Sequence, residues 1–139
     1  MKIFNGTLGT NLAMASPNLS PEALLARLRE LSVESFLGRF RAGLATAVGE
    51  DGRRLSAGER QMIGLIRALL GTPAVLIVEE GFNALDPEAF AQAVRLVRTH
   101  AHAGAVLLVS HAQQMISIVD EHFILEGGAV VPDSHARAA

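Results

Sequence analysis

The sequence contains no cysteine, which excludes disulfide bonds, thiolate metal sites and thiol redox chemistry. It also lacks an excess of either charge, because 12 basic side chains stand against 14 acidic ones. Such a balance gives no electrostatic footprint for nucleic acid or an anionic membrane surface. No apolar run approaches the roughly 18 residues of a membrane-spanning helix, so we expect the isolated chain to be soluble.

Lysine is almost absent too, since Lys2 is the only one in 139 residues. A phosphate-binding P-loop has the pattern G-x-x-x-x-G-K-[ST], in which backbone amides cradle the phosphates and the lysine reaches the terminal ones. No such pattern occurs here. We therefore expect this chain alone to bind a nucleoside triphosphate no tighter than about millimolar.

Hydrophobic residues, in contrast, make up 50% of the sequence, enough for one domain with a buried core. The clearest pattern begins at Ser56, which with Glu59 has the form of a capping box at a helix start. An amphipathic helix should follow and should end near Gly71 and Pro73. Its buried stripe is expected to consist of Met62, Ile63, Leu65, Ile66, Leu69 and Leu70.

The next stretch predicts a strand. Residues 74–78 form an uninterrupted apolar run, which is typical of a strand covered on both faces in a parallel sheet. Glu79 and Glu80 follow it directly. They would lie at the carboxyl end of the strand, where open α/β sheets place their ligands.

The rest of the chain continues in an α/β pattern. Ser20-Pro21 and Asp86-Pro87 each pair an N-cap residue with proline at the first helical position. Helices should therefore begin at residues 21 and 87, the second running to about residue 99. We further expect a loop or edge at 2–11, a short helix at 32–40, a loop at 43–54, a second buried strand at 105–109, a short helix at 113–119, a hairpin of 123–126 with 129–131, and a frayed tail at 132–139.

Five stretches, in this order, resemble motifs of the ATP-binding cassette (ABC) family. Residues 46–52, TAVGEDG, resemble a segment typical of its exporter branch, and residues 55–61, LSAGERQ, resemble the signature motif. Residues 75–80, VLIVEE, resemble the Walker B strand, and residues 83–86 resemble the D-loop. His111 matches the switch histidine.

The resemblance covers roughly residues 4–131. It implies the C-terminal part of an exporter-type nucleotide-binding domain without a Walker A motif. The implied fold is α/β, a partial P-loop NTPase with the helical subdomain and the C-terminal part of the parallel-sheet core. The single partial domain, 1–139, would comprise a helical subdomain with the signature motif at about 12–62, a core with Walker B, D-loop and H-loop at about 63–131, and a tail at 132–139.

The resemblance also implies catalytic roles. Glu80 corresponds to the general base that polarises the attacking water, and His111 to the histidine that contacts the γ-phosphate. Glu79 stands where the family has the aspartate that holds Mg²⁺ through water. Because its side chain is one methylene longer, we expect weaker metal binding. The D-loop would consist of Asn83, Ala84, Leu85 and Asp86.

The signature residues Ser56, Ala57, Gly58 and Glu59 would contact ATP bound on an opposite cassette. The N–H groups and positive dipole end of their helix suit an anion. Ala57 replaces a glycine and Glu59 replaces a glutamine of the family motif. A restricted backbone and an added negative charge should both weaken phosphate binding.

Each feature has a simpler interpretation when taken alone. Ser56 and Glu59 would then only cap a helix, the two glutamates would be solvated charges at a strand end, and His111 would be structural or merely exposed. A small α/β domain without any nucleotide role would, however, require five ordered matches to arise by coincidence.

The favoured function is therefore the ATP-binding and ATP-hydrolysing subunit of an ABC exporter, represented by a fragment without the P-loop and inactive as an isolated chain. ATP and Mg²⁺ are the implied cofactors of the intact protein. The implied partners are a second cassette and an exporter's transmembrane domain, at the cytoplasmic face of the membrane, with no nucleic acid. The alternative is a non-catalytic interaction module that supplies the signature helix to a complete cassette or a membrane partner.

Overall fold

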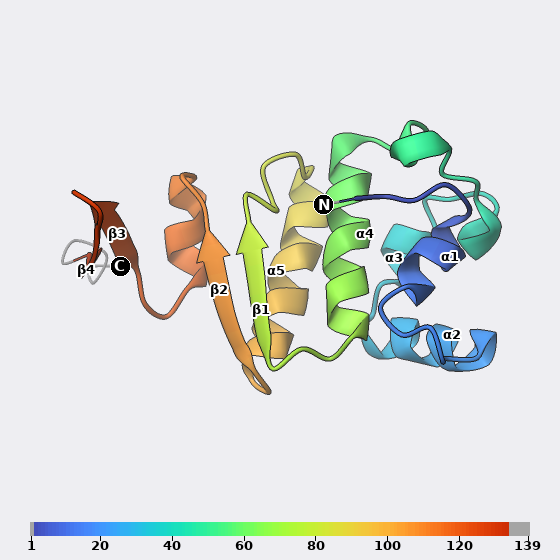
Figure 1. Ribbon diagram of the computed structural model, residues 1–139, viewed down its shortest axis with the longest axis horizontal. Helices are drawn as coiled ribbons and strands as arrows, with labels where there is room; N and C mark the ends of the chain where they lie inside the picture. Colours follow the sequence, from blue (N-terminus) through green and yellow to red (C-terminus); the bar gives the residue numbers. More distant parts are fainter. Residues whose placement is uncertain (1, 134–139) are drawn as a thin grey trace. The chain divides into compact units, whose positions relative to one another are not determined.

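A computed structural model describes residues 2–133 and divides the chain into two compact units, Met1–Val109 and Ser110–Ala139. Residues 134–139 of the predicted tail lie outside the described residues. The first unit contains five α-helices, two short 3₁₀ turns and a two-stranded parallel sheet (Figure 1). Its elements are α1 (Leu8–Ala13), α2 (Pro21–Glu30), α3 (Glu34–Leu37), η1 (Gly43–Ala45), η2 (Glu50–Gly52), α4 (Ala57–Leu70), β1 (Val75–Glu79), α5 (Pro87–Ala101) and β2 (Ala105–Val109).

Helix α4 is the central helix of this unit and packs against α1, α5 and β1. The predicted start, end and buried stripe are all confirmed. Ser56 is the N-cap in a capping box with Glu59, and Gly71 is the C-cap. The six apolar residues of the stripe are all buried, so the burial of one apolar face anchors the helix.

Strands β1 and β2 pair in parallel, from Val75 with Ala105 to Glu79 with Val109, and α5 connects them. The α/β fold class is confirmed. The predicted burial of both faces is wrong, because α4 and α5 cover only the face that carries Leu76. On the opposite face Val75, Ile77 and Leu107 are 56%, 64% and 53% exposed. We call the exposed side chains Val75, Ile77, Leu107 and Val109 the exposed sheet face.

The N-terminal region is more helical than the sequence suggested. The loop predicted at 2–11 contains the start of α1, because Thr7 caps this helix in a capping box with Thr10. A threonine in place of the usual glutamate or glutamine hides this signal. The short helix predicted at 32–40 is confirmed only in its middle, as α3, and two 3₁₀ turns interrupt the loop predicted at 43–54.

The second unit consists of η3 (Gln113–Ile118) and the hairpin of β3 (Phe123–Glu126) and β4 (Ala129–Pro132). The predicted hairpin is confirmed. Gly127 and Gly128 have φ values of +59° and +81°, the left-handed backbone that a tight two-residue hairpin turn requires. The short helix predicted at 113–119 is a 3₁₀ helix and ends one residue earlier.

Candidate functional site at the start of helix α4 and the end of strand β1

The first turn of α4 combines an exposed hydroxyl with backbone donors. The Ser56 N–H donates to Glu59 Oε2 at 2.7 Å, and the Glu59 N–H donates to Ser56 Oγ at 3.1 Å. The N–H groups of Ala57 and Gly58 have no partner within the helix, because the first turn of an α-helix lacks preceding carbonyls. This turn can therefore bind an anion, and the Glu59 carboxylate places a negative charge beside that position.

Gly58 brings this turn into contact with the segment after β1. A Cβ atom at Gly58 would lie 2.6 Å from the carbonyl oxygen of Ala84 and 3.6 Å from the Cα atom of Leu85. Only glycine allows an approach this close without a shift of the backbone. The close approach of Gly58 to Ala84 therefore brings the predicted signature residues next to the predicted D-loop residues.

Gln61 connects the same two regions by hydrogen bonds. Its Nε2 donates to the carbonyl oxygen of Glu80 at 3.1 Å, and its Oε1 accepts from the Ala84 N–H at 3.0 Å. The sequence pattern predicted no role for Gln61. The available signal was its position three residues after Gly58, which places both residues on one helical face.

Glu80 stands at the end of the parallel ladder, where its N–H donates to the Val109 carbonyl at 2.9 Å. Its φ of +49° is in the left-handed region, which costs a residue with a side chain about 1 kcal/mol or more. The Asn83 Nδ2 donates a short hydrogen bond to its Oε2. Two predicted site residues thus meet directly, and the strained backbone is of the kind found at functional sites.

Asp86 has both a structural and an electrostatic role. Its Oδ1 accepts from the Ala89 N–H at 2.8 Å and so caps α5. Arg39, which follows α3, donates to Asp86 at 2.8 Å and to Glu88 at 2.9 Å. The hydrogen bond from Arg39, followed by that from the Ala89 amide, lowers the pKa of the Asp86 carboxyl. Arg39 therefore ties the predicted D-loop to the helices before α4.

Comparisons with known proteins support one family. The chain is 32% identical over 130 residues to the ABC transporter ATM1 of Toxoplasma gondii and 33% identical over 128 residues to the cyclolysin secretion ATP-binding protein CyaB of Bordetella pertussis. These matches cover 94% and 92% of this chain, but only 12% and 18% of those proteins. The solved structure of a bacterial Atm1-family ABC exporter with ATP bound superposes on 93% of this chain and 23% of its own chain, with a TM-score of 0.81 and 28% identity.

Over more than nine tenths of its length, the chain is therefore similar to ATP-binding proteins of ABC exporters. A further relative is the mycobactin import ATP-binding/permease protein IrtB of Mycolicibacterium thermoresistibile, 36% identical over 131 residues, which are 94% of this chain and 23% of that protein. No family profile matches the chain. None of the helices among residues 2–133 is long and apolar enough to cross a membrane.

The position expected to hold Mg²⁺ is Glu79, the last residue of β1. Strand alternation places Glu79 on the same side of the sheet as Val75 and Ile77, and it is exposed. No group of three or more metal-binding side chains gathers within the described part of the chain. One exposed carboxylate is compatible with Mg²⁺, because this ion commonly takes one or two carboxylates and completes its shell with water and substrate phosphates.

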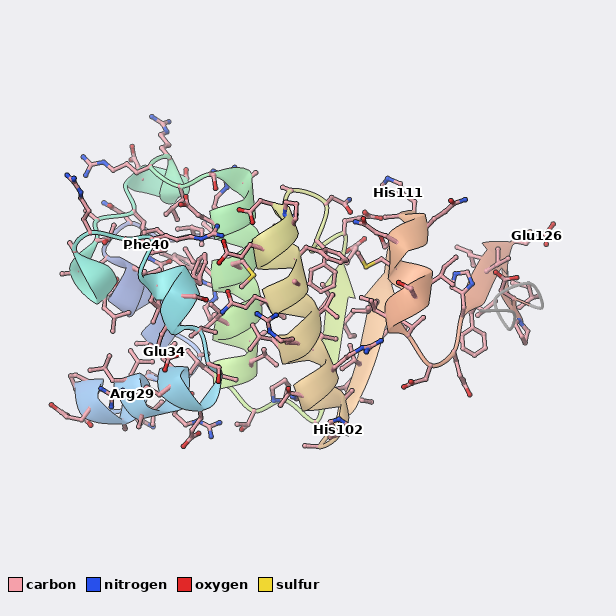
Figure 2. The ribbon with its side chains drawn as sticks, turned by 180° about the vertical axis from the view of Figure 1, so that it is seen from behind. Arg29, Glu34, Phe40, His102, His111 and Glu126 are labelled. Carbon is pink, nitrogen blue, oxygen red and sulfur yellow. The ribbon has the colours of Figure 1, made fainter. Side chains whose placement is uncertain are left out.

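His111 lies in the second unit, directly after Ser110, whose Oγ accepts from the Ala112 N–H at 3.1 Å. His111 is exposed, and its predicted contact with the γ-phosphate stays a prediction. Among the other histidines, His102 is the C-cap of α5 (Figure 2).

The chain brings together the signature-like, Walker B-like and D-loop-like residues within its first unit.

Proposed function

We propose that this chain supplies the signature turn, the Walker B carboxylates and the D-loop of an ATP-hydrolysing cassette in an ABC exporter. The contact of Gly58 with Ala84 is the single observation that supports this most, because it joins a turn suited to phosphate with the segment that follows Glu80. The matched proteins are several times longer than this chain, so the P-loop of the active assembly would come from residues outside these 139.

In this proposal, Glu80 is the general base. Its carboxylate accepts a proton as water attacks the γ-phosphorus, and Asn83 holds one carboxylate oxygen in place. His111 would donate a hydrogen bond to the γ-phosphate, and Glu79 would hold Mg²⁺. Bound Mg²⁺ would neutralise negative charge on the phosphate oxygens.

The first turn of α4 contacts ATP held by a second cassette. Ser56 Oγ and the amides of Ala57 and Gly58 are the donors, and Glu59 weakens the contact by its charge. This arrangement requires two cassettes as partners, with Asn83, Ala84, Leu85 and Asp86 as the D-loop between them.

We place the helical subdomain at about 12–62 and the core at about 63–131.

The remaining partner is a transmembrane domain, which would hold the cassette at the cytoplasmic face of a membrane. Export is the proposed direction, because residues 46–52 resemble the exporter branch and the relative CyaB is named as a secretion protein. The name of IrtB, in contrast, states import, and this relative is similar to the chain over a comparable length.

A second candidate is a non-catalytic module that offers the α4 turn to a complete cassette. The exposure of Ser56 and Ala57 favours this candidate, because an exposed turn is accessible to a partner. A turn that acts only on a partner's nucleotide needs no general base on its own chain.

Hydrolysis of MgATP by a complete cassette built with this chain distinguishes the two functions. Glu80→Gln keeps shape and hydrogen-bonding capacity but removes the base, so we expect kcat to fall by about 10²-fold or more. Glu121→Gln, at an exposed position of the second unit, is the control and should keep the parental rate. A parental rate in Glu80→Gln would favour the non-catalytic module.

A further inference from the structure

The Gln61 side chain bonds both the residue that follows β1 and the turn before α5. Its amide donates to the Glu80 carbonyl and accepts from the Ala84 N–H, at 3.1 and 3.0 Å. No role for this residue follows from the family resemblance, and the proposed hydrolysis step does not use it.

The two backbone groups that Gln61 bonds both lie outside regular structure. The β1–β2 ladder ends at Glu79, and Glu80 turns out of it with a φ of +49°. Ala84 lies in the turn before α5. A primary amide can donate to one such group and accept from the other at once, whereas a carboxylate can only accept and an aliphatic side chain can do neither.

We propose that Gln61 is a positioning residue that couples the first turns of α4 to the backbone of Glu80 and the D-loop of the same cassette. This inference rests on the proposed function. A phosphate bound at Ser56 and Gly58 would fix α4, and Gln61 passes that constraint to the peptide that follows the catalytic carboxylate. Gly58 contributes by holding α4 close enough to Ala84 for both hydrogen bonds to form.

The coupling is local because Gln61 is three residues from Gly58 on the same helix. A shift of the α4 N-terminus relative to β1 would break both hydrogen bonds of Gln61. ATP held by the second cassette would bind the α4 turn of this chain. Through Gln61, this binding would affect the position of Glu80 in the same chain.

The first test measures amide hydrogen exchange of this chain by NMR. Gln61→Met keeps the side-chain length but removes both hydrogen bonds, so exchange at the Ala84 amide should increase about fivefold. Gln61→Glu retains the acceptor and should leave Ala84 protected. Gln92→Met is the matched control, because Gln92 bonds Ser32 and Ser35 elsewhere in the unit. Unchanged exchange at Ala84 in Gln61→Met would overturn the proposal.

The second test measures ATP hydrolysis in the complete cassette. Gln61→Met and Gln61→Glu should both lower kcat about tenfold, because both lose the bond to the Glu80 carbonyl, while the KM for ATP changes less than about twofold. Gln92→Met should retain the parental kcat. Equal losses in all variants, or a change in KM alone, would contradict the positioning role. A parent without hydrolysis would contradict the proposed function instead, and the exchange of Ala84 would still decide whether Gln61 holds the D-loop.

Discussion

Arg39 and Asp86 form an ion pair at 2.8 Å although 47 positions separate them in the sequence. The pair lowers the pKa of Asp86 below its ordinary value of 3.8 in the folded state. A lowered carboxyl pKa stabilises the fold at pH values above 3.8, and this contribution disappears as the pH falls through the folded-state pKa.

Asp86→Asn tests this contribution, because asparagine still caps α5 but cannot form the ion pair. The free energy of unfolding in urea should be lower than that of the parent by a constant amount above about pH 5. The difference should shrink toward zero at pH values below the folded-state pKa of Asp86. A difference that stays the same down to pH 2 would show that the carboxylate charge contributes nothing.

Gly58 provides the second prediction. In Gly58→Ala the new Cβ meets the Ala84 carbonyl, a backbone atom that no rotamer change can move, so we expect a loss of about 1–3 kcal/mol in urea unfolding. Alanine would favour the helix by at most about 1 kcal/mol, which is too little to reverse the sign. Ala57→Ser, one residue away and exposed, should change stability by less than about 0.5 kcal/mol. A stabilised Gly58→Ala would mean that α4 and the D-loop are farther apart.

The neighbours Leu76 and Ile77 test the two faces of β1. Leu76 is 4% exposed, and Leu76→Ala should cost about 2–5 kcal/mol through lost burial and a cavity. Ile77 is 64% exposed, so Ile77→Ala should cost about 1 kcal/mol or less, mostly through strand preference. Urea unfolding at several protein concentrations measures both. If Ile77→Ala and Leu76→Ala lowered the free energy of unfolding equally at low protein concentration, the exposed sheet face would have to be covered within the single chain.

The sequence predicted the elements whose signals are local. The α4 capping box, the α4 apolar stripe and the Gly127-Gly128 turn each depend on residues within a few positions of one another, and all three are confirmed. The exposed sheet face was not predicted. An apolar run shows that both faces of a strand can be buried, but it does not show which segments cover them. Non-local contacts were missed as well. The bonds of Gln61 to Glu80 and of Arg39 to Asp86 join positions 19 and 47 residues apart, and no periodic pattern marks either pair.

Glu79 gives a prediction about the metal. In a complete cassette, Glu79→Asp shortens the carboxylate arm to the length typical of the family. We therefore expect half-maximal hydrolysis at a lower Mg²⁺ concentration. Glu88→Asp, on the first turn of α5, is the control and should leave the Mg²⁺ dependence unchanged. An unchanged Mg²⁺ titration for Glu79→Asp would mean that the longer side chain is already accommodated.

If the α4 turn of one cassette binds the ATP of another, MgATP should join two complete cassettes, and size-exclusion chromatography measures this dimer. Glu80→Gln should bind ATP without hydrolysing it and elute as a dimer. Adding Ser56→Arg should return the protein to the monomer, because a bulky side chain then occupies the position of the phosphate. Ser20→Arg is the matched control, because the Ser20 hydroxyl caps α2 by accepting from the Ala23 N–H, so both arginine variants lose an N-cap of about 1 kcal/mol. We expect Glu80→Gln with Ser20→Arg to remain dimeric and Glu80→Gln with Ser56→Arg to be monomeric. An ATP-dependent dimer that persists with Ser56→Arg would show that the α4 turn does not bind the ATP of the second cassette.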